Sequence, residues 1–259
     1  MNFVLNTIAM GLTVVSIFSA PSIQATEVSS NIVAKQQAVE IRQLDTNWKN
    51  VPTQFINAGG INFAYREYGQ ENRGTPVIFL NHLAAVLDNW DPRIVDGIAA
   101  KHHVVIFDNR GIGASTGLPA KSIEQMADDA ITFIQAKGFK QVDLFGFSMG
   151  GMISQEIALK QPQLIRKMIL SGTGPAGGTG ISIVGRVSNW DLIRGMATRQ
   201  DPKVYLFFTR TDNGKAAAKE FVQRINERRE TAMQNKIIHD INFILRLLKS
   251  RQDFFDFLF

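Results

Sequence analysis

The chain has 259 residues, of which 45% are hydrophobic and 20% charged, a composition typical of a globular protein and not of a disordered, collagen-like or membrane-bundle protein. It has no cysteine, which excludes disulfides, thiolate zinc sites and a cysteine nucleophile. The formal net charge is +5 and lies wholly in residues 194–259, but no Lys/Arg block alternates with aromatic residues, so nucleic-acid binding is not supported.

The amino-terminal residues have the pattern of a secretory signal peptide. An apolar run covers residues 8–18, and Ile23-Gln24-Ala25 resembles a small-residue cleavage site. The run is shorter than the roughly 20 apolar residues that span a bilayer as a helix. A signal peptide usually carries Lys or Arg before this run and this chain has none, so an uncleaved anchor or a buried helix is the alternative. We expect a signal peptide at residues 1–25 and a periplasmic or secreted mature chain, with a cytoplasmic or membrane-anchored chain as the other possibility.

The next residues predict an α/β fold that begins with a β-hairpin. Residues 26–53 are polar and have no clear period, so we expect a linker or loosely packed arm. Two β-rich runs, at 54–58 and 61–68, flank Gly59-Gly60 and predict the hairpin. Short apolar runs then predict strands buried on both faces, at residues 76–80, 104–107, 142–145 and 168–170. Their alternation with helical segments predicts a mainly parallel sheet.

Helical patterns follow in two places. Apolar residues after Ser122 have helical spacing, Ser122 and Gln125 predict a capping box, and Gly138 predicts the end of the helix. Beyond a glycine-rich break at 174–180, the chain is helical and charged with no clear strand, so we expect a core at 54–175 and a helical cap at 176–259. Aromatic residues of this cap are expected to pack among its helices, with a pocket wall as the alternative; they are Trp190, Phe207, Phe208 and Phe221.

Gly146-Phe147-Ser148-Met149-Gly150 is a G-x-S-x-G motif between a predicted strand and a helix that runs to about Pro162. The turn is so sharp that a side chain at 146 or 150 would clash, and it presents Ser148 Oγ clear of the backbone. The start of the helix adds N–H donors and the positive end of the helix dipole. A helix cap or a plain glycine turn is the alternative. No Gly-Lys-Ser/Thr follows Gly150 and no dinucleotide-binding glycine pattern follows the first parallel strand, which excludes those nucleotide sites.

With this motif, residues 54–175 resemble the α/β-hydrolase family, in particular its haloperoxidase-like and proline-iminopeptidase-like branch. Leu80-Asn81-His82-Leu83 is similar to the family's His-Gly oxyanion loop, although His82 stands where glycine is usual. Residues 107–115 resemble its Asp-x-Arg-Gly-x-Gly-x-Ser turn, in which we expect Asp108 and Arg110 to hold the turn by an internal ion pair and hydrogen bonds. The resemblance implies that Ser148 is the nucleophile and that the N–H groups of Leu83 and Met149 form the oxyanion hole. For His82 we expect a structural or orienting role, with that of a base as the alternative.

The resemblance implies a serine hydrolase that transfers an acyl group from an ester, lactone or small amide, acts on a small-molecule substrate and needs no cofactor or metal. The family's haloperoxidase activity stays open because it uses the same residues, whereas haloalkane dehalogenation is disfavoured because it uses a carboxylate at the position of Ser148. The alternative is a non-catalytic hydrolase-like protein that binds an apolar ligand, or that uses its basic cap on an anionic membrane surface.

The base and the acid of a triad are not evident. In this fold both follow the serine, and His239 is the one histidine after Ser148, with Asp191, Asp201 or Asp212 as a formal acid. An apolar helical stripe at residues 237–248 favours a structural role for His239. We therefore hypothesise a truncated hydrolase that lacks its last strands and has weak or no turnover; downstream coding DNA without remnants of a strand, an acid and a Gly-His segment would contradict this.

Overall fold

A computed structural model describes residues 47–83, 85–175, 178, 190–191, 193–195 and 197–228. The predicted signal peptide and His239 lie outside the described residues, as does the predicted linker up to residue 46. Among the described helices, none has the length and apolar character that a membrane span needs.

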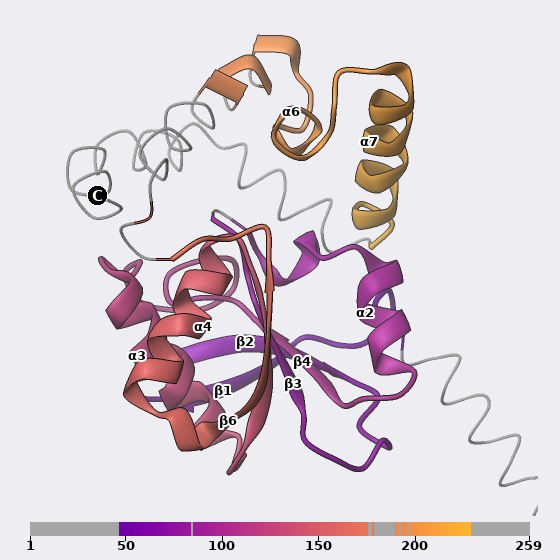
Figure 1. Cartoon of the computed structure of the whole chain (residues 1–259). Coiled ribbons are helices and arrows are strands. Elements are labelled where there is room, and N and C mark those ends of the chain that lie inside the picture. Colours follow the sequence, from indigo (N-terminus) through magenta and orange to yellow (C-terminus); the bar gives the residue numbers. More distant parts are fainter. Residues whose placement is uncertain are drawn as a thin grey trace, which may run out of the picture. The chain divides into compact units, whose positions relative to one another are not determined.

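The described strands form one mixed sheet (Figure 1). Its order is β1 (Gln54–Ala58), β2 (Ile61–Tyr68), β4 (Val104–Phe107), β3 (Val77–Leu80), β5 (Val142–Phe147) and β6 (Ile165–Ser171). β2 is antiparallel to both of its neighbours, and the other pairs are parallel. The predicted hairpin and the mainly parallel sheet are confirmed. Because parallel strands end at the same edge of a sheet, the segments that follow β3, β4 and β5 meet there.

Helices cover both faces of this sheet. α3 (Ile123–Ala136) and α4 (Met149–Lys160) lie side by side on one face, and α2 (Pro92–Ala99) lies on the other (Figure 1). Further helices are α6 (Lys203–Phe207), α7 (Asp212–Ile225) and the short 3₁₀ turns η1 (Leu87–Asn89) and η2 (Pro162–Leu164). Residues 190–191, 193–195 and 197–198 are also helical.

The capping of α3 agrees only in part with the prediction. Ser122 Oγ accepts a hydrogen bond from Gln125 N at 3.0 Å, and the helix ends just before Gly138, whose φ is +76°, as expected. The Gln125 side chain accepts from Lys121 N at 2.8 Å and not from Ser122 N, so the second half of the predicted capping box is wrong. The Gln125 side chain therefore bonds the backbone of Lys121, the residue before the N-cap, instead of the backbone of the N-cap residue Ser122.

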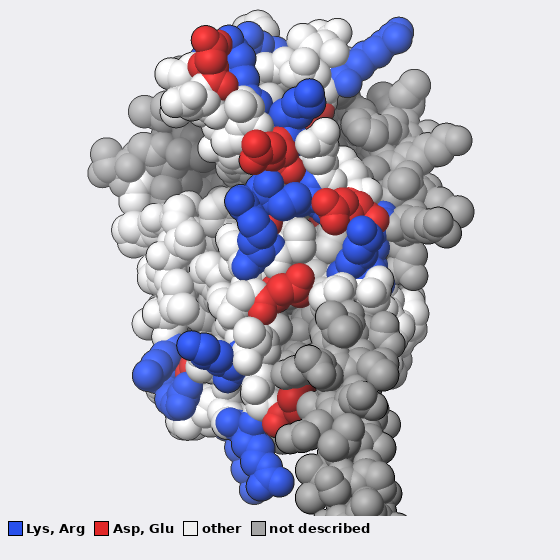
Figure 2. Space-filling view, turned by 90° about the vertical axis from the view of Figure 1, so that its right-hand side faces the viewer, with Lys and Arg blue, Asp and Glu red and all other residues white. Residues whose placement is uncertain are grey.

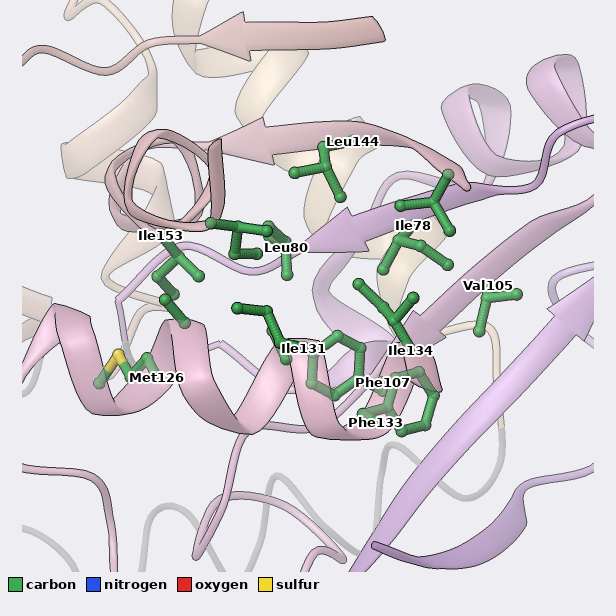
Figure 3. Close-up of a cluster of buried hydrophobic side chains, with 14 of the residues drawn as sticks. Ile78, Leu80, Val105, Phe107, Met126, Ile131, Phe133, Ile134, Leu144 and Ile153 are labelled. Carbon is green, nitrogen blue, oxygen red and sulfur yellow. The ribbon is translucent and has the colours of Figure 1, made fainter. Parts of the chain in front are cut away.

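One buried cluster fills the space between α3, α4 and the sheet. Side chains of α3 meet those of β3, β4 and β5, with Ile153 of α4 beside them (Figure 3). Phe107 and Phe133 stack at its centre, with ring centroids 4.3 Å apart. This packing fixes the position of α4, and with it the start of the helix that follows Ser148.

Two expectations about burial are wrong. Strand β6 is not buried on both faces, because it is the outer strand of the described sheet and Met168, Ile169 and Leu170 are 37–53% exposed. Residues 47–53 are not a loosely packed arm: Trp48 is fully buried against the α2 face. Trp48 N donates to Asp96 Oδ1 at 2.7 Å, and Arg228 NH1 donates to Trp48 O at 2.6 Å, so contacts distant in sequence hold this segment.

Acidic and basic side chains alternate on the face formed by α2 and α7, which Figure 2 turns toward the viewer. Arg224 pairs with Asp91 at 2.8 Å, Lys215 pairs with Asp212 at 3.1 Å, and Lys49 lies 3.5 Å from Glu227. Basic residues in this part of the cap thus lie among carboxylates, the arrangement of a solvated helical face rather than of a uniform basic patch.

A buried ion cluster lies near the amino end of β4, away from the strand ends that meet at the G-x-S-x-G motif. Glu67 accepts from His103 Nε2 at 3.1 Å and pairs with Lys137. Burial by itself would raise the pKa of Glu67, but the hydrogen bonds and charges of His103 and Lys137 outweigh burial and lower the pKa to about 2.

We expect this cluster to make the protein acid-labile between about pH 4.5 and pH 2. A carboxyl whose pKa is lowered on folding stabilises the folded state above its ordinary pKa of 4.5, and that contribution, on the order of 3 kcal/mol, is lost as the pH falls toward 2. Urea unfolding at pH 7 and pH 3 measures it. Glu67→Gln should flatten the pH dependence in this range, and the exposed control Glu71→Gln should not; equal slopes for both variants would contradict the assignment.

Candidate active site

Ser148 occupies a strained turn between β5 and α4. Its φ of 53° and ψ of −117° lie in a region that non-glycine residues rarely adopt, and it is one of two non-glycine residues with positive φ among those described. The turn is held from β6, because Ser148 N donates to Ser171 O at 2.9 Å. Ser148 as a whole is half-buried.

The glycines on either side leave no room for a side chain, as the sequence predicts. A Cβ on Gly146 would lie 2.4 Å from Gly150 O, and a Cβ on Gly150 would lie 1.9 Å from Leu80 O. A Cβ on Gly151 would meet Thr173 at 2.4 Å. The turn is therefore tight because the start of α4 is pressed against the end of β3, and glycine is the only residue that allows this approach.

The loop after β3 lies at the same edge of the sheet. Asn81 is almost fully buried, and its side chain joins Phe107 O to the indole of Trp90. Ala85 N donates to His82 O at 3.2 Å and closes a turn around Leu83. Leu83 is thus carried by a short turn that begins directly beside the first turn of α4.

The two predicted oxyanion donors have N–H groups that the surrounding secondary structure leaves available. Met149 is the first residue of α4, so its N–H has no acceptor within the helix, and it lies at the positive end of the helix dipole. Within the described part of the chain, Leu83 N donates to no other backbone carbonyl. Both groups follow strands whose carboxyl ends are adjacent, because β3 pairs with β5 as far as Leu80 and Gly146.

His82 lies in aromatic surroundings. Its ring packs edge-on against Phe147 and Phe207, with centroids 5.5 and 5.1 Å away. Its Nδ1 lies 2.9 Å from Leu83 O, and because a carbonyl only accepts, Nδ1 carries the proton. Burial, and after it the charge of Lys203, lower the pKa of His82 to about 4, so the imidazole is neutral at pH 7 and a weak base.

The turn after β4 is held by different partners from those expected. The Asp108 carboxylate accepts from Leu87 N at 2.7 Å and from Ala114 N at 3.0 Å, and burial raises its pKa to about 7. Arg110 does not pair with Asp108; it forms a two-pronged ion pair with Asp129 of α3, with Nε at 2.8 Å. The predicted hydrogen bonds of Asp108 are confirmed. The predicted ion pair within the turn is wrong, because Arg110 pairs with Asp129 and so joins the turn to α3.

The three aspartates named as formal acids have different surroundings. Asp212 has a side chain that is 99% exposed and Asp201 pairs with Lys203 at 3.2 Å, whereas Asp191 is buried. His239 lies outside the described residues, so its distance to any of them is not defined. No described group of three or more His, Cys, Asp or Glu side chains is placed to hold a metal ion.

One aromatic residue of the cap reaches the site, contrary to expectation. Phe207 lies against Phe147, the residue before Ser148, as well as against His82. Phe208 and Phe221 pack on each other at 5.5 Å, as expected, and Trp190 is 70% exposed.

The segment Asp88-Asn89-Trp90-Asp91, which supports the loop after β3, was not predicted from the sequence. Asn89 Oδ1 accepts from Val86 N at 2.9 Å, and Trp90 Nε1 donates to Asn81 at 2.6 Å. The sequence offered one signal for this segment: Asp88 and Asp91 flank the amide of Asn89 and the indole of Trp90. Polar groups of this kind need hydrogen-bond partners when they are buried, so such a run can indicate a network that holds a loop.

A comparison with protein families matches residues 75–252 to a model described as the alpha/beta hydrolase fold. Among curated proteins, the chain is 29% identical over 126 residues to "Putative carbamate hydrolase RutD" of Azorhizobium caulinodans, covering 48% of this chain and 46% of that protein. It is 32% identical over 114 residues to "Putative non-heme bromoperoxidase BpoC" of Mycobacterium tuberculosis, covering 44% and 42%. The match thus spans less than half the length of these relatives.

Among solved structures, an alpha/beta hydrolase fold protein from Chitinophaga pinensis is 34% identical, with a TM-score of 0.63. The match covers 70% of this chain and 64% of that one.

Proposed function

Because the chain belongs to the alpha/beta hydrolase fold family, we propose that it is a serine hydrolase that transfers an acyl group from an ester, lactone or small amide, with Ser148 as the nucleophile. The observation that carries this proposal is the strained backbone of Ser148 between two glycines that admit no Cβ. Strain of this kind costs about 1 to 3 kcal/mol and persists where function requires the geometry. The similarity to the relative named "Putative carbamate hydrolase RutD" supports the reaction class.

In the proposed reaction, Ser148 Oγ forms a bond to the carbonyl carbon and its proton passes to a base. The carbonyl oxygen gains negative charge, which the N–H groups of Leu83 and Met149 stabilise. Collapse of this intermediate breaks the bond to the leaving group, which takes the proton, and water then releases the acyl group in the same way. Loss of one such donor typically costs about a hundredfold or more in rate.

The general base is proposed to come from outside the described residues. His103 directly precedes β4, and β4 and β5 are both parallel to β3, so His102 and His103 lie at the edge of the sheet opposite Ser148. His82 lies at the correct edge, but the pKa of about 4 makes its imidazole a weak base. Covalent reactivity of Ser148 and sustained turnover are therefore separate questions.

A second function, binding of an apolar ligand without turnover, is supported by the aromatic surroundings of the serine. Phe147, Phe207 and His82 lie within 5.1–5.5 Å of one another beside Ser148. Binding of a hydrophobic fluorescent dye together with an unreactive Ser148 would favour this function over hydrolysis.

A fluorophosphonate probe tests the proposed function, because its phosphorus is attacked by an activated serine and its oxygen occupies an oxyanion hole. We expect one adduct on the native chain, mapped by fragmentation mass spectrometry to Ser148 and not to the buried Ser154 of α4. Heat-denatured protein should not react. Absence of an adduct, or equal labelling of native and denatured protein, would overturn the proposal.

A further inference from the structure

The loop that carries Leu83 is held by a buried side chain to which the proposed reaction gives no role. Asn81 is 1% exposed. Its Nδ2 donates to Phe107 O at 2.9 Å, and its Oδ1 accepts from Trp90 Nε1 at 2.6 Å. One amide therefore joins the carboxyl ends of β3 and β4 to the segment that follows η1.

The indole that bonds Asn81 is itself fixed. Trp90 is 5% exposed and packs edge-on against Phe79, with ring centroids 4.7 Å apart. Its ring also lies tilted against that of Phe145, at 5.4 Å. The next residue, Asp91, caps α2 and pairs with Arg224 of α7. Trp90 Nε1 is consequently a rigid donor, and a rigid donor confines the amide that it binds.

The backbone of Asn81 also touches the start of α4. A Cβ on Gly150 would lie 1.9 Å from Leu80 O and 3.0 Å from Asn81 O, so no gap separates the end of β3 from the residue after Met149. Leu83 follows Asn81 by two residues. A displacement of Asn81 would therefore change the separation of the Leu83 and Met149 N–H groups.

We propose that Asn81 is a positioning residue for the oxyanion hole: its side-chain amide, clamped between Phe107 O and Trp90 Nε1, sets the place of the Leu83 N–H relative to that of Met149. This inference rests on the proposed function. Asn81 acts through the loop, because both ends of its amide are occupied by protein partners. A misplacement of about 1 Å at a reacting centre can cost about a hundredfold in rate.

The test separates the reversible binding of a fluorophosphonate (KI) from the rate of bond formation (kinact). Asn81→Leu has nearly the same size and removes both hydrogen bonds. We expect kinact to fall about 10- to 100-fold while KI changes less than about threefold, because only bond formation places negative charge in the hole. Asn72→Leu is the matched control: it removes a similar bond, from Asn72 Nδ2 to Ala99 O at 2.7 Å, at the far edge of the sheet, and should leave kinact unchanged.

Trp90→Phe removes the same hydrogen bond from the other side and keeps an aromatic ring, so it serves if Asn81→Leu does not fold. It should also lower kinact, and the double variant should be no slower than Asn81→Leu alone, because both changes break one interaction. Hydrogen exchange gives a readout that does not depend on reactivity: amides of residues 81–87 should exchange faster in both variants.

The outcomes distinguish the two proposals. An unchanged kinact in a folded Asn81→Leu variant, with the wild type labelled at Ser148, would overturn the role of Asn81 and leave the serine hydrolase standing. A uniform rise of exchange throughout the sheet would mean that Asn81 only stabilises the fold, which also overturns its positioning role. No labelling of the wild type would overturn both proposals.

Discussion

Ser148→Ala is expected to abolish covalent labelling by a fluorophosphonate, because the variant lacks the oxygen that bonds to phosphorus. Where the wild type hydrolyses an ester, we expect the variant to lose several orders of magnitude in rate, as serine hydrolases do when the nucleophile is removed. The free energy of unfolding should change little, since the Ser148 side chain does not cap α4. In-gel fluorescence and an ester assay measure the two effects.

Ser122→Ala is the control for this experiment. It removes a hydroxyl that caps α3 and should cost about 1 kcal/mol of stability without affecting labelling. Ser148→Gly should be unreactive but about 1 kcal/mol more stable than Ser148→Ala, because glycine adopts a φ of 53° without strain. Persistent labelling of Ser148→Ala would mean that another residue is the nucleophile.

Gly150→Ala is expected to destabilise the fold by several kcal/mol or to prevent folding. The added methyl group would lie 1.9 Å from Leu80 O and 2.4 Å from Leu80 C, and backbone atoms at the end of a buried strand have little room to move. Overpacking in a core typically costs about 1 to 3 kcal/mol, and a collision between two main-chain segments is at the upper end or beyond. Urea unfolding measures the loss.

The matched control is Gly97→Ala in α2, where nothing lies within 4 Å of the added Cβ. We expect it to stabilise the protein by about 0.5 to 1 kcal/mol, because alanine favours the helix. Both variants exchange a helical glycine for alanine, so their difference isolates the contact with β3. A Gly150→Ala variant as stable as the wild type would show that the end of β3 can yield, and would remove the steric basis of the tight turn.

Elements with a local signal were predicted well. Gly59-Gly60 identified the hairpin, Ser122 and Gly138 identified the limits of α3, and the apolar run before Gly146 identified β5. Each signal lies in a few neighbouring residues and follows from their own conformational preference for a turn, a helix end or a strand. Helix α2 was missed, although Asp91 and Pro92 mark its start, because its eight residues contain few buried apolar side chains.

Features that depend on distant partners were not predicted. Arg110 stands two residues from Asp108, yet its guanidinium reaches Asp129 because α3 folds back beside the turn. Phe207 follows Phe147 by sixty residues and still lies against it. Residues 47–53 appear polar in the sequence, but Trp48 is buried because α2 supplies both an apolar surface and the Asp96 carboxylate that accepts from its N–H.

The sequence by itself determined the hairpin, the buried strands that follow it, helices α3 and α4, and the serine turn, since a glycine on each side of Ser148 marks a bend where no side chain fits. Only the tertiary structure decided what surrounds that turn: the Asn81 amide between Phe107 and Trp90, the neutral His82 between two aromatic rings, and the exposed β6. The physical reason is that backbone preference acts between neighbours along the chain, whereas hydrogen bonding, burial and the pKa of a side chain depend on which segments meet in space.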